Sequence, residues 1–214
     1  MSKKIMFNDK YRLTRAVLER RQTQTRRLLT LTLHKKTDEC NNLIEVHPSK
    51  VFFEDGKWKF EYDGYVFLLP KKNYPKYKVG EVVAVAQSYK DIFSSFSQHP
   101  NPQLNIGVKN PTDTAGWNNK MFVKPNLMPH HIKINDVKVE RLQDISDETS
   151  IKEGIRDYST PNEKRYGYSD FMREEIVAFR TPREAFASLI DKVSGKGTWE
   201  SNPYVFVYDF ELVD

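Results

Sequence analysis

The sequence predicts an α+β fold, in which a small antiparallel or mixed sheet is flanked by a few short helices. Asp-Gly turn signals at residues 55–56 and 63–64 separate runs of apolar and aromatic residues, which is the pattern of antiparallel hairpins. Helical and strand-like segments follow one another irregularly, and the regular β-α-β alternation of a doubly wound fold is missing. Together these observations favour a mostly antiparallel sheet or a small barrel.

Three segments have the periodicity or the end signals of helices. Residues 8–21, NDKYRLTRAVLERR, repeat apolar side chains at helical spacing, and the following QTQT ends this helix near Arg20. Residues 146–154 and 181–195 begin with cap residues, and the second of these segments also has a proline at its first helical position. The expected N-caps are Asn8 or Asp9 for the first helix, Ser146 for the second and Thr181 for the third.

Strands are expected where apolar residues alternate or run together. Residues 81–89 form a short buried-strand candidate, and residues 203–213 form a strong strand. Residues 131–142 alternate, with a phase break at Asn135–Asp136 that predicts a bulge or a tight turn. Residues 90–128 are rich in Asn, Pro, Ser and Gly, and we expect them to form a long loop.

The 214 residues suit one domain with insertions at about 31–75 and 90–128. Cys40 is the single cysteine, which excludes an intramolecular disulfide and a multi-cysteine metal site and favours a cytoplasmic location. The first residues contain no long apolar run, so we expect no signal peptide and no membrane span. His130 and His131 are adjacent on an extended segment and diverge, so no metal or other cofactor is expected.

Positive charge gathers in the first part of the sequence. The net charge is +5, and residues 12–36 contain eight lysines and arginines but one acid, Glu19. Within this region the stretch RRQTQTRR, residues 20–27, offers guanidinium groups that can bind phosphate bidentately and hydroxyl groups that can donate to it. The alternative is a solvated basic surface with a few salt bridges. The candidate nucleic-acid-binding residues are Arg20, Arg21, Gln22, Thr23, Thr25, Arg26 and Arg27.

Strand alternation decides which of these side chains can share a site. Neighbours on a strand point to opposite faces, so the four arginines cannot all line one cavity. Arg27, two residues beyond Thr25, is the arginine that we expect to face inward. Aromatic residues of the hairpins, such as Trp58 and Tyr65, could stack on bases, but a half-buried hairpin more often buries them in a core.

Four segments in a fixed order resemble the ASCH-domain family, and in particular its phage- and prophage-encoded members. The resemblance covers about half of the chain, and the order of the segments makes it more specific than any one of them. It implies a PUA-like fold, which is a small pseudo-barrel with helices packed around a cleft. The segments are AVLERRQTQTRRL (16–28), KYKVGEVVAV (76–85), MPHHIKINDVKVERLQDISDETSIKEGI (128–155) and WESNPYVFVYDFELV (199–213).

The resemblance also implies two kinds of function. PUA-like domains mostly bind RNA or modified bases, and some small ASCH proteins are amidohydrolases that act on N4-acetylcytidine. For those hydrolases it implies a lysine base, a threonine nucleophile and a glutamate acid. In this sequence the lysine position is Gln22, the nucleophile position is Thr25 and the glutamate position is Glu153. The glycine that ends the family's helix is replaced by Arg20.

Because Gln22 occupies the lysine position, binding is favoured over hydrolysis. Glutamine cannot take a proton near neutral pH, and a threonine hydroxyl needs a neighbouring base to become a useful nucleophile. We therefore expect binding of RNA or a modified nucleotide in a cleft beside residues 20–27. The alternative is an amidohydrolase of an N4-acylated cytidine with Thr25 as nucleophile and Glu153 as acid. A third possibility is an accessory protein that contacts another protein through residues 90–128.

Overall fold

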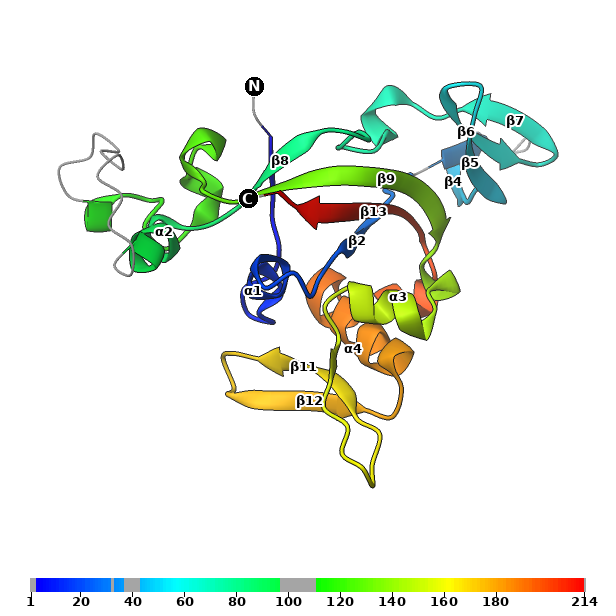
Figure 1. Ribbon diagram of the computed structural model, residues 1–214. Coiled ribbons are helices and arrows are strands. Elements are labelled where there is room, and N and C mark those ends of the chain that lie inside the picture. Colours follow the sequence, from blue (N-terminus) through cyan, green and yellow to red (C-terminus); the bar gives the residue numbers. More distant parts are fainter. Residues whose placement is uncertain (1–2, 32, 37–42, 97–110, 214) are drawn as a thin grey trace.

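A curved five-stranded sheet forms the centre of the molecule in the computed structural model, which describes residues 3–31, 33–36, 43–96 and 111–213 (Figure 1). Its strand order is β1-β8-β9-β13-β2, and every neighbouring pair is antiparallel except β1 with β8. The described residues close no barrel, because β1 and β2 remain the two edges of this sheet. The strands are β1 (Lys4–Ile5), β2 (Gln24–Leu28), β8 (Val82–Val85), β9 (His131–Arg141) and β13 (Tyr204–Leu212).

The two longest strands, β9 and β13, pair along their whole length with one irregularity. Asp136 is opposite Asp209, whereas Ile134 is opposite Phe210, so Asn135 is an extra residue on β9. This confirms the bulge that the phase break predicts. Residues of β13 alternate between the two faces of the sheet, and most of them are buried because β13 lies in the interior of the sheet with cover on both sides.

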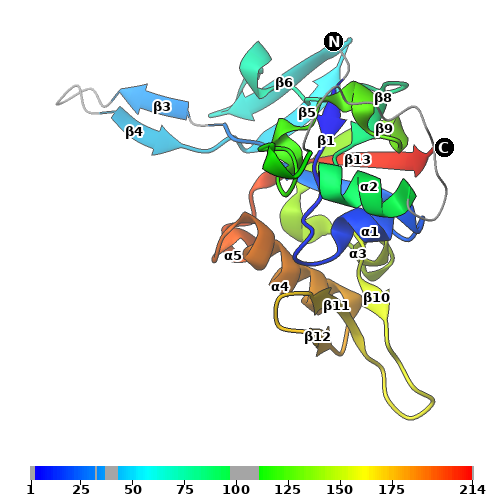
Figure 2. The ribbon, with the colours of Figure 1, turned by 90° about the vertical axis from the view of Figure 1, so that its left-hand side faces the viewer.

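The helices α1, α3 and α4 lie together on one side of the sheet in both views (Figure 1, Figure 2). The predicted caps of α3 and α4 are confirmed, since Ser146 and Thr181 each accept a hydrogen bond from the third helical amide. The predicted long first helix is wrong at its start. Asn8 instead accepts from the amide of Lys10, Asp9 accepts from the hydroxyl of Thr14, and the helix begins after Arg12, whose φ is 55°. The helices are α1 (Leu13–Leu18), α2 (Tyr89–Phe96), α3 (Asp147–Lys152), α4 (Pro182–Ser194) and α5 (Thr198–Ser201).

The two Asp-Gly pairs form the hairpins that the sequence predicts. Asp55 and Gly56 both have positive φ, as do Asp63 and Gly64, which is the requirement of a type I′ turn. The resulting sheet has the order β5-β6-β7, and a separate hairpin, β3-β4, projects from the molecule (Figure 2). These strands are β3 (Leu33–Lys36), β4 (Leu43–Val46), β5 (Lys50–Glu54), β6 (Lys57–Tyr62) and β7 (Tyr65–Leu68).

The aromatic hairpin residues divide between core and surface. The ring of Trp58 lies 5.0 Å from that of Phe206 on β13, so the expected core role is confirmed for Trp58. Tyr65 is 70% exposed on the edge strand β7. Cys40 lies outside the described residues.

The predicted loop at 90–128 is wrong at its start, because α2 begins at Tyr89. Ile92 on α2 packs with Tyr89, Val123 and Met128 against β8, in a second small core. The rest of the described part forms short 3₁₀ turns, and residues 97–110 lie outside the described residues. The 3₁₀ turns of the chain are η1 (Lys71–Asn73), η2 (Pro111–Asp113), η3 (Lys120–Phe122), η4 (Pro125–Leu127) and η5 (Leu142–Asp144).

A three-stranded antiparallel sheet, β10-β11-β12, packs against α4 at the far end of the molecule from β7 (Figure 1). The sequence did not predict these strands. They are β10 (Arg156–Asp157), β11 (Tyr166–Asp170) and β12 (Glu175–Phe179). None of the helices in the described ranges has the length and apolar character needed to cross a membrane.

Candidate functional site

A cavity of about 270 Å³ lies beside the edge strand β2, between that strand, the residues after β1 and the helix α4. Its polar lining comes mainly from residues 22–27 and from the end of α3, and its apolar lining comes mainly from one face of α4. The polar residues include Gln22, Thr25, Arg26, Arg27 and Glu153. The apolar residues include Leu13, Phe186, Leu189, Ile190 and Val193.

The end of α1 directs Gln22 toward this cavity. Arg20 has a φ of 59°, and the amides of Arg20 and Arg21 donate to carbonyls of the last helical turn. Arg20 thus has a left-handed backbone, which a glycine adopts without strain and which costs a residue with a side chain about 1 kcal/mol. Next along the chain, the Thr23 amide donates to the carbonyl of Lys152, which ties the start of β2 to the end of α3. This contact brings Glu153 beside β2.

Gln22 is buried, with 2% of its surface exposed. Its Nε2 donates to the carbonyl of Gln24 at 3.1 Å, while its Oε1 has no hydrogen-bond partner among the described residues. Gly154 has a φ of 99°, and a Cβ at that position would lie 3.2 Å from Gln22 Oε1. A buried carbonyl oxygen without a partner costs about 1–3 kcal/mol, which a donor on a ligand would recover.

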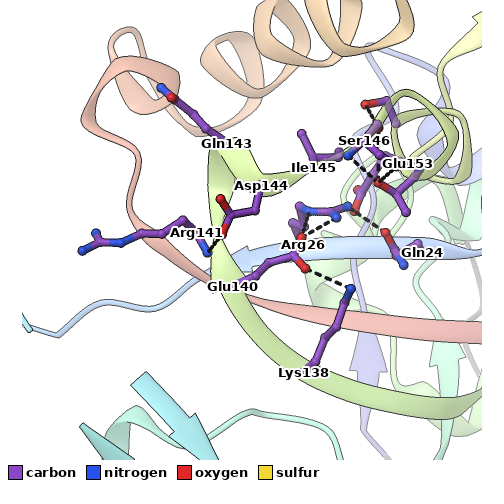
Figure 3. A network of polar contacts seen from close by, with 12 residues as sticks. Gln24, Arg26, Lys138, Glu140, Arg141, Gln143, Asp144, Ile145, Ser146 and Glu153 are labelled. Atoms are coloured by element: carbon purple, nitrogen blue, oxygen red, sulfur yellow. Dashed lines mark hydrogen bonds and ion pairs between the residues drawn. The ribbon is translucent and has the colours of Figure 1, made fainter. Parts of the chain in front are cut away.

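Arg26 is held by acidic and amide groups on three sides (Figure 3). Its Nη1 donates to Glu153 Oε1 at 2.8 Å and to Gln24 Oε1 at 2.7 Å, and its Nη2 donates to Glu140 Oε1 at 2.6 Å. Only 1% of the Arg26 side chain is exposed. Two carboxylates therefore neutralise this guanidinium, and Arg26 serves to position Glu153 and Glu140 rather than to meet a phosphate.

The two glutamates of this network are perturbed in opposite directions. Burial raises the pKa of Glu153 above its ordinary value, although Arg26 and Arg27 oppose the rise. Burial also acts to raise the pKa of Glu140, but hydrogen bonds from Lys138 and Arg26 outweigh it and lower that pKa. Glu153 thus takes up a proton more readily than an exposed glutamate does, while Glu140 holds its charge.

Arg27 faces the cavity, as its position two residues beyond Thr25 predicts. Its Nη2 donates to the carbonyl of Met6 at 2.5 Å, and its guanidinium lies over the ring of Phe7 at 5.6 Å. The side chain therefore bridges the open seam between the two edges of the sheet. Its Nε is buried without a partner, and no carboxylate of the described residues forms an ion pair with it. Burial lowers the pKa of this guanidinium.

The remaining candidates of the stretch 20–27 lie outside this cavity. Arg20 is exposed and donates to the carbonyl of Leu212 at 2.7 Å. Arg21 pairs with Glu19 at 2.7 Å and lines a separate, smaller hollow of about 100 Å³ beside α1. Thr23 is partly buried and contributes its backbone. The eight residues therefore do not form one phosphate cradle, and the structure brings Gln22, Thr25, Arg26, Arg27 and Glu153 together instead.

Several residues of the site were not predicted as such. The apolar stripe of α4 was evident in the sequence, but nothing there marked it as a cavity wall. Nothing in the sequence marked Met6 or Glu140 as part of the site, because each belongs to it only through a hydrogen bond from an arginine that is distant in sequence. Within the described ranges, no three His, Cys, Asp or Glu residues are grouped so that they could hold a metal ion.

Comparison of the chain with models of known protein families, with curated proteins and with solved structures found no match. The geometry of the cavity is therefore the main basis for a functional conclusion.

Proposed function

We propose that this protein is a cytoplasmic, PUA-like module of the ASCH type that binds a base of RNA or a modified nucleotide in the cavity beside β2. One observation supports this most directly. Gln22, Thr25, Arg27 and Glu153 come from two separate segments and line one cavity, and two buried polar atoms of this lining, Gln22 Oε1 and Arg27 Nε, have no partner among the described residues. Such convergent polar groups over an apolar wall are typical of small-ligand sites.

The chemistry of the lining matches the edge of a nucleobase. Gln22 Oε1 and the Glu153 carboxylate can accept from an exocyclic amino group, while Arg27 Nε and the Thr25 hydroxyl can donate to ring nitrogen or carbonyl oxygen. The apolar face of α4, with Phe186 and Leu189, suits the flat face of a base. An unpaired base that is turned out of its strand would present this combination.

The proposal predicts different roles for the two threonines of the stretch. Thr25→Val should weaken binding of N4-acetylcytidine or cytidine about tenfold, which corresponds to the loss of one hydrogen bond of about 1.4 kcal/mol. Thr23→Val is the matched control, because Thr23 is on the same segment but outside the cavity. This variant should bind the nucleoside with the affinity of the wild type. Isothermal titration calorimetry measures both. Equal effects of the two substitutions, or no binding of either nucleoside, would contradict the proposal.

Amide hydrolysis is the second candidate, and one observation favours it. Thr25 and Glu153 line the same cavity, and burial raises the pKa of Glu153, which suits a proton donor. The difficulty is the base, because Arg26, Arg27 and Glu153 are the ionisable groups of the described lining, and a guanidinium is a poor base.

Turnover of N4-acetylcytidine to cytidine tests this candidate. If the protein is a hydrolase, the wild type releases cytidine, Thr25→Val abolishes the release and Gln22→Lys increases it by supplying the missing base. Chromatography of the reaction mixture measures the product, with Thr23→Val as the control that keeps wild-type activity. Absence of cytidine from both the wild type and Gln22→Lys would exclude hydrolysis of this substrate.

A further inference from the structure

A second cavity, of about 360 Å³, lies next to the first along the open seam of the sheet. The two cavities share Met6, Arg27 and Leu28 in their linings. The hydrogen bond between Arg27 Nη2 and the carbonyl of Met6 thus stands where the two cavities meet. We propose that the second cavity holds the neighbouring nucleotide, so that the ligand is a strand of at least two nucleotides with its linking phosphate at Arg27. This inference rests on the proposed function of the first cavity.

The charge of the second cavity favours a phosphate. Arg27, Lys72 and Lys76 contribute to its lining, and no acidic residue does so in the part of the chain that the structure describes. Among the same residues, neither lysine forms an ion pair, although Lys76 lies over the ring of Tyr77 at 5.5 Å. Cations that share a hollow repel one another, and a phosphate group between them would remove this repulsion.

The walls of the second cavity favour a base beside that phosphate. The rings of Tyr77 and Tyr208 meet edge to face with centroids 5.4 Å apart. Both hydroxyls are held by hydrogen bonds, because that of Tyr77 donates to the carbonyl of Lys4 at 2.9 Å and that of Tyr208 accepts from the amide of Lys76 at 3.0 Å. The rings are therefore fixed. Tyr74 is partly buried in the same lining, and stacking of one base on such a ring contributes about 1–3 kcal/mol.

An amide oxygen without a partner occurs in this cavity as in the first. Asn73 Nδ2 donates to the carbonyl of Thr30, whereas Asn73 Oδ1 is buried and has no partner among the described residues. The first cavity presents Gln22 Oε1 in the same condition. Each cavity is thus lined by one amide side chain whose oxygen is open to the amino group of a base, and Arg27, whose Nε has no partner among the described residues, lies in the wall they share. This repeated arrangement fits two successive nucleotides better than one nucleoside.

The test compares ligands of different length on one protein. Titration calorimetry at two salt concentrations would use N4-acetylcytidine and the two dinucleotides that join this nucleoside to uridine in either order. We expect one dinucleotide to bind at least about tenfold more tightly than the nucleoside, with an advantage that shrinks as salt rises. In the double variant Lys72→Gln/Lys76→Gln this advantage should fall to about threefold or less, while the affinity for the nucleoside stays the same. Tyr74→Leu should also reduce it.

Lys57→Gln/Lys124→Gln is the matched control, since both lysines are exposed and line neither cavity, and it should keep the full advantage. A tetraglutamate peptide separates nucleotide recognition from attraction to any polyanion. If the nucleoside binds and neither dinucleotide binds more tightly, the second nucleotide site is wrong and the first stands. If no nucleoside or dinucleotide binds, both proposals fail. An advantage that the control variant loses equally, or that tetraglutamate matches, would overturn the second site.

Discussion

Replacing Arg26 by methionine is expected to lower the free energy of unfolding by about 3–5 kcal/mol at neutral pH, because it leaves a buried carboxylate without its partner. The guanidinium is almost fully buried and donates to Glu153 and Glu140 at 2.8 and 2.6 Å. Glu140 keeps a second partner in Lys138, at 2.9 Å, whereas no other ion pair to Glu153 is found among the described residues. The loss should therefore arise mainly at Glu153. Urea unfolding at pH 7 measures it.

The double variant Arg26→Met/Glu153→Gln is the control for this mechanism. Glutamine removes the uncompensated charge at nearly the same volume, so the double variant should be more stable than Arg26→Met alone. If the double variant is less stable than Arg26→Met, the cost comes from lost packing around Arg26 and not from the unpaired carboxylate.

The effect of pH on the same variant has a definite sign. Burial raises the pKa of Glu153 in the folded protein above its value in the unfolded chain. The folded protein therefore binds this proton more tightly, and the contribution of Glu153 to the free energy of unfolding falls as pH rises from the unfolded-state pKa to the folded-state pKa. Loss of Arg26 removes the main group that opposes this rise, and so it increases the difference between the two pKa values of Glu153. Glu140 has a lowered pKa, and its stabilising contribution is lost as pH falls. The difference in the free energy of unfolding between the wild type and Arg26→Met should hence shrink as the pH falls from 7 toward about 4.3, the ordinary glutamate pKa. A difference that is constant with pH would contradict this account.

Replacing Phe186 by alanine is expected to cost about 3–5 kcal/mol of unfolding free energy and to weaken nucleoside binding at the same time. Phe186 is 2% exposed on α4, with its ring 6.3 Å from that of Trp199 and 5.8 Å from the Arg26 guanidinium. Alanine leaves a void that these neighbours fill only in part. It also removes a flat part of the wall of the first cavity.

Val193→Ala is the matched control on the same helix and in the same cavity wall. Val193 is 38% exposed, so its truncation removes little buried surface and should cost less than about 1 kcal/mol. Denaturant unfolding measures the stability of both variants, and calorimetry measures their affinities. Similar losses of stability in the two variants would show that Phe186 has no special place in the core.

The sequence predicted best the features that are decided by neighbouring residues. The Asp-Gly hairpin turns and the caps at Ser146 and Thr181 follow from a few adjacent side chains, and all are present. The predicted start of α1 was wrong because both cap candidates bind other groups: Asn8 accepts from the amide of Lys10, and Asp9 accepts from the hydroxyl of Thr14 rather than from a helical amide. The helix α2 was missed because polar serines and a loop-like context obscured its apolar spacing.

The candidate site was predictable only in part for the same reason. The family resemblance pointed to Gln22, Thr25 and Glu153, and strand alternation pointed to Arg27, and all four line one cavity. The partner of Arg26 could not be predicted, because Glu140 lies 114 positions away and only the register of the sheet brings the two together. The separation of Arg20 and Arg21 from Arg27 also depends on the exit from α1, where an arginine has a left-handed backbone.

The position of β2 in the sheet has a consequence for protein synthesis. Among the described residues this strand is an edge and pairs with β13 alone, so Gln24 meets Asp209 across 185 positions of sequence. A ribosome that has just released β2 therefore exposes a strand that cannot yet pair, and β13 follows only after the whole intervening chain has been translated. The cavity beside β2 does not exist on a shorter nascent chain. A protein that binds RNA in this way would acquire that ability only after β13 has been translated.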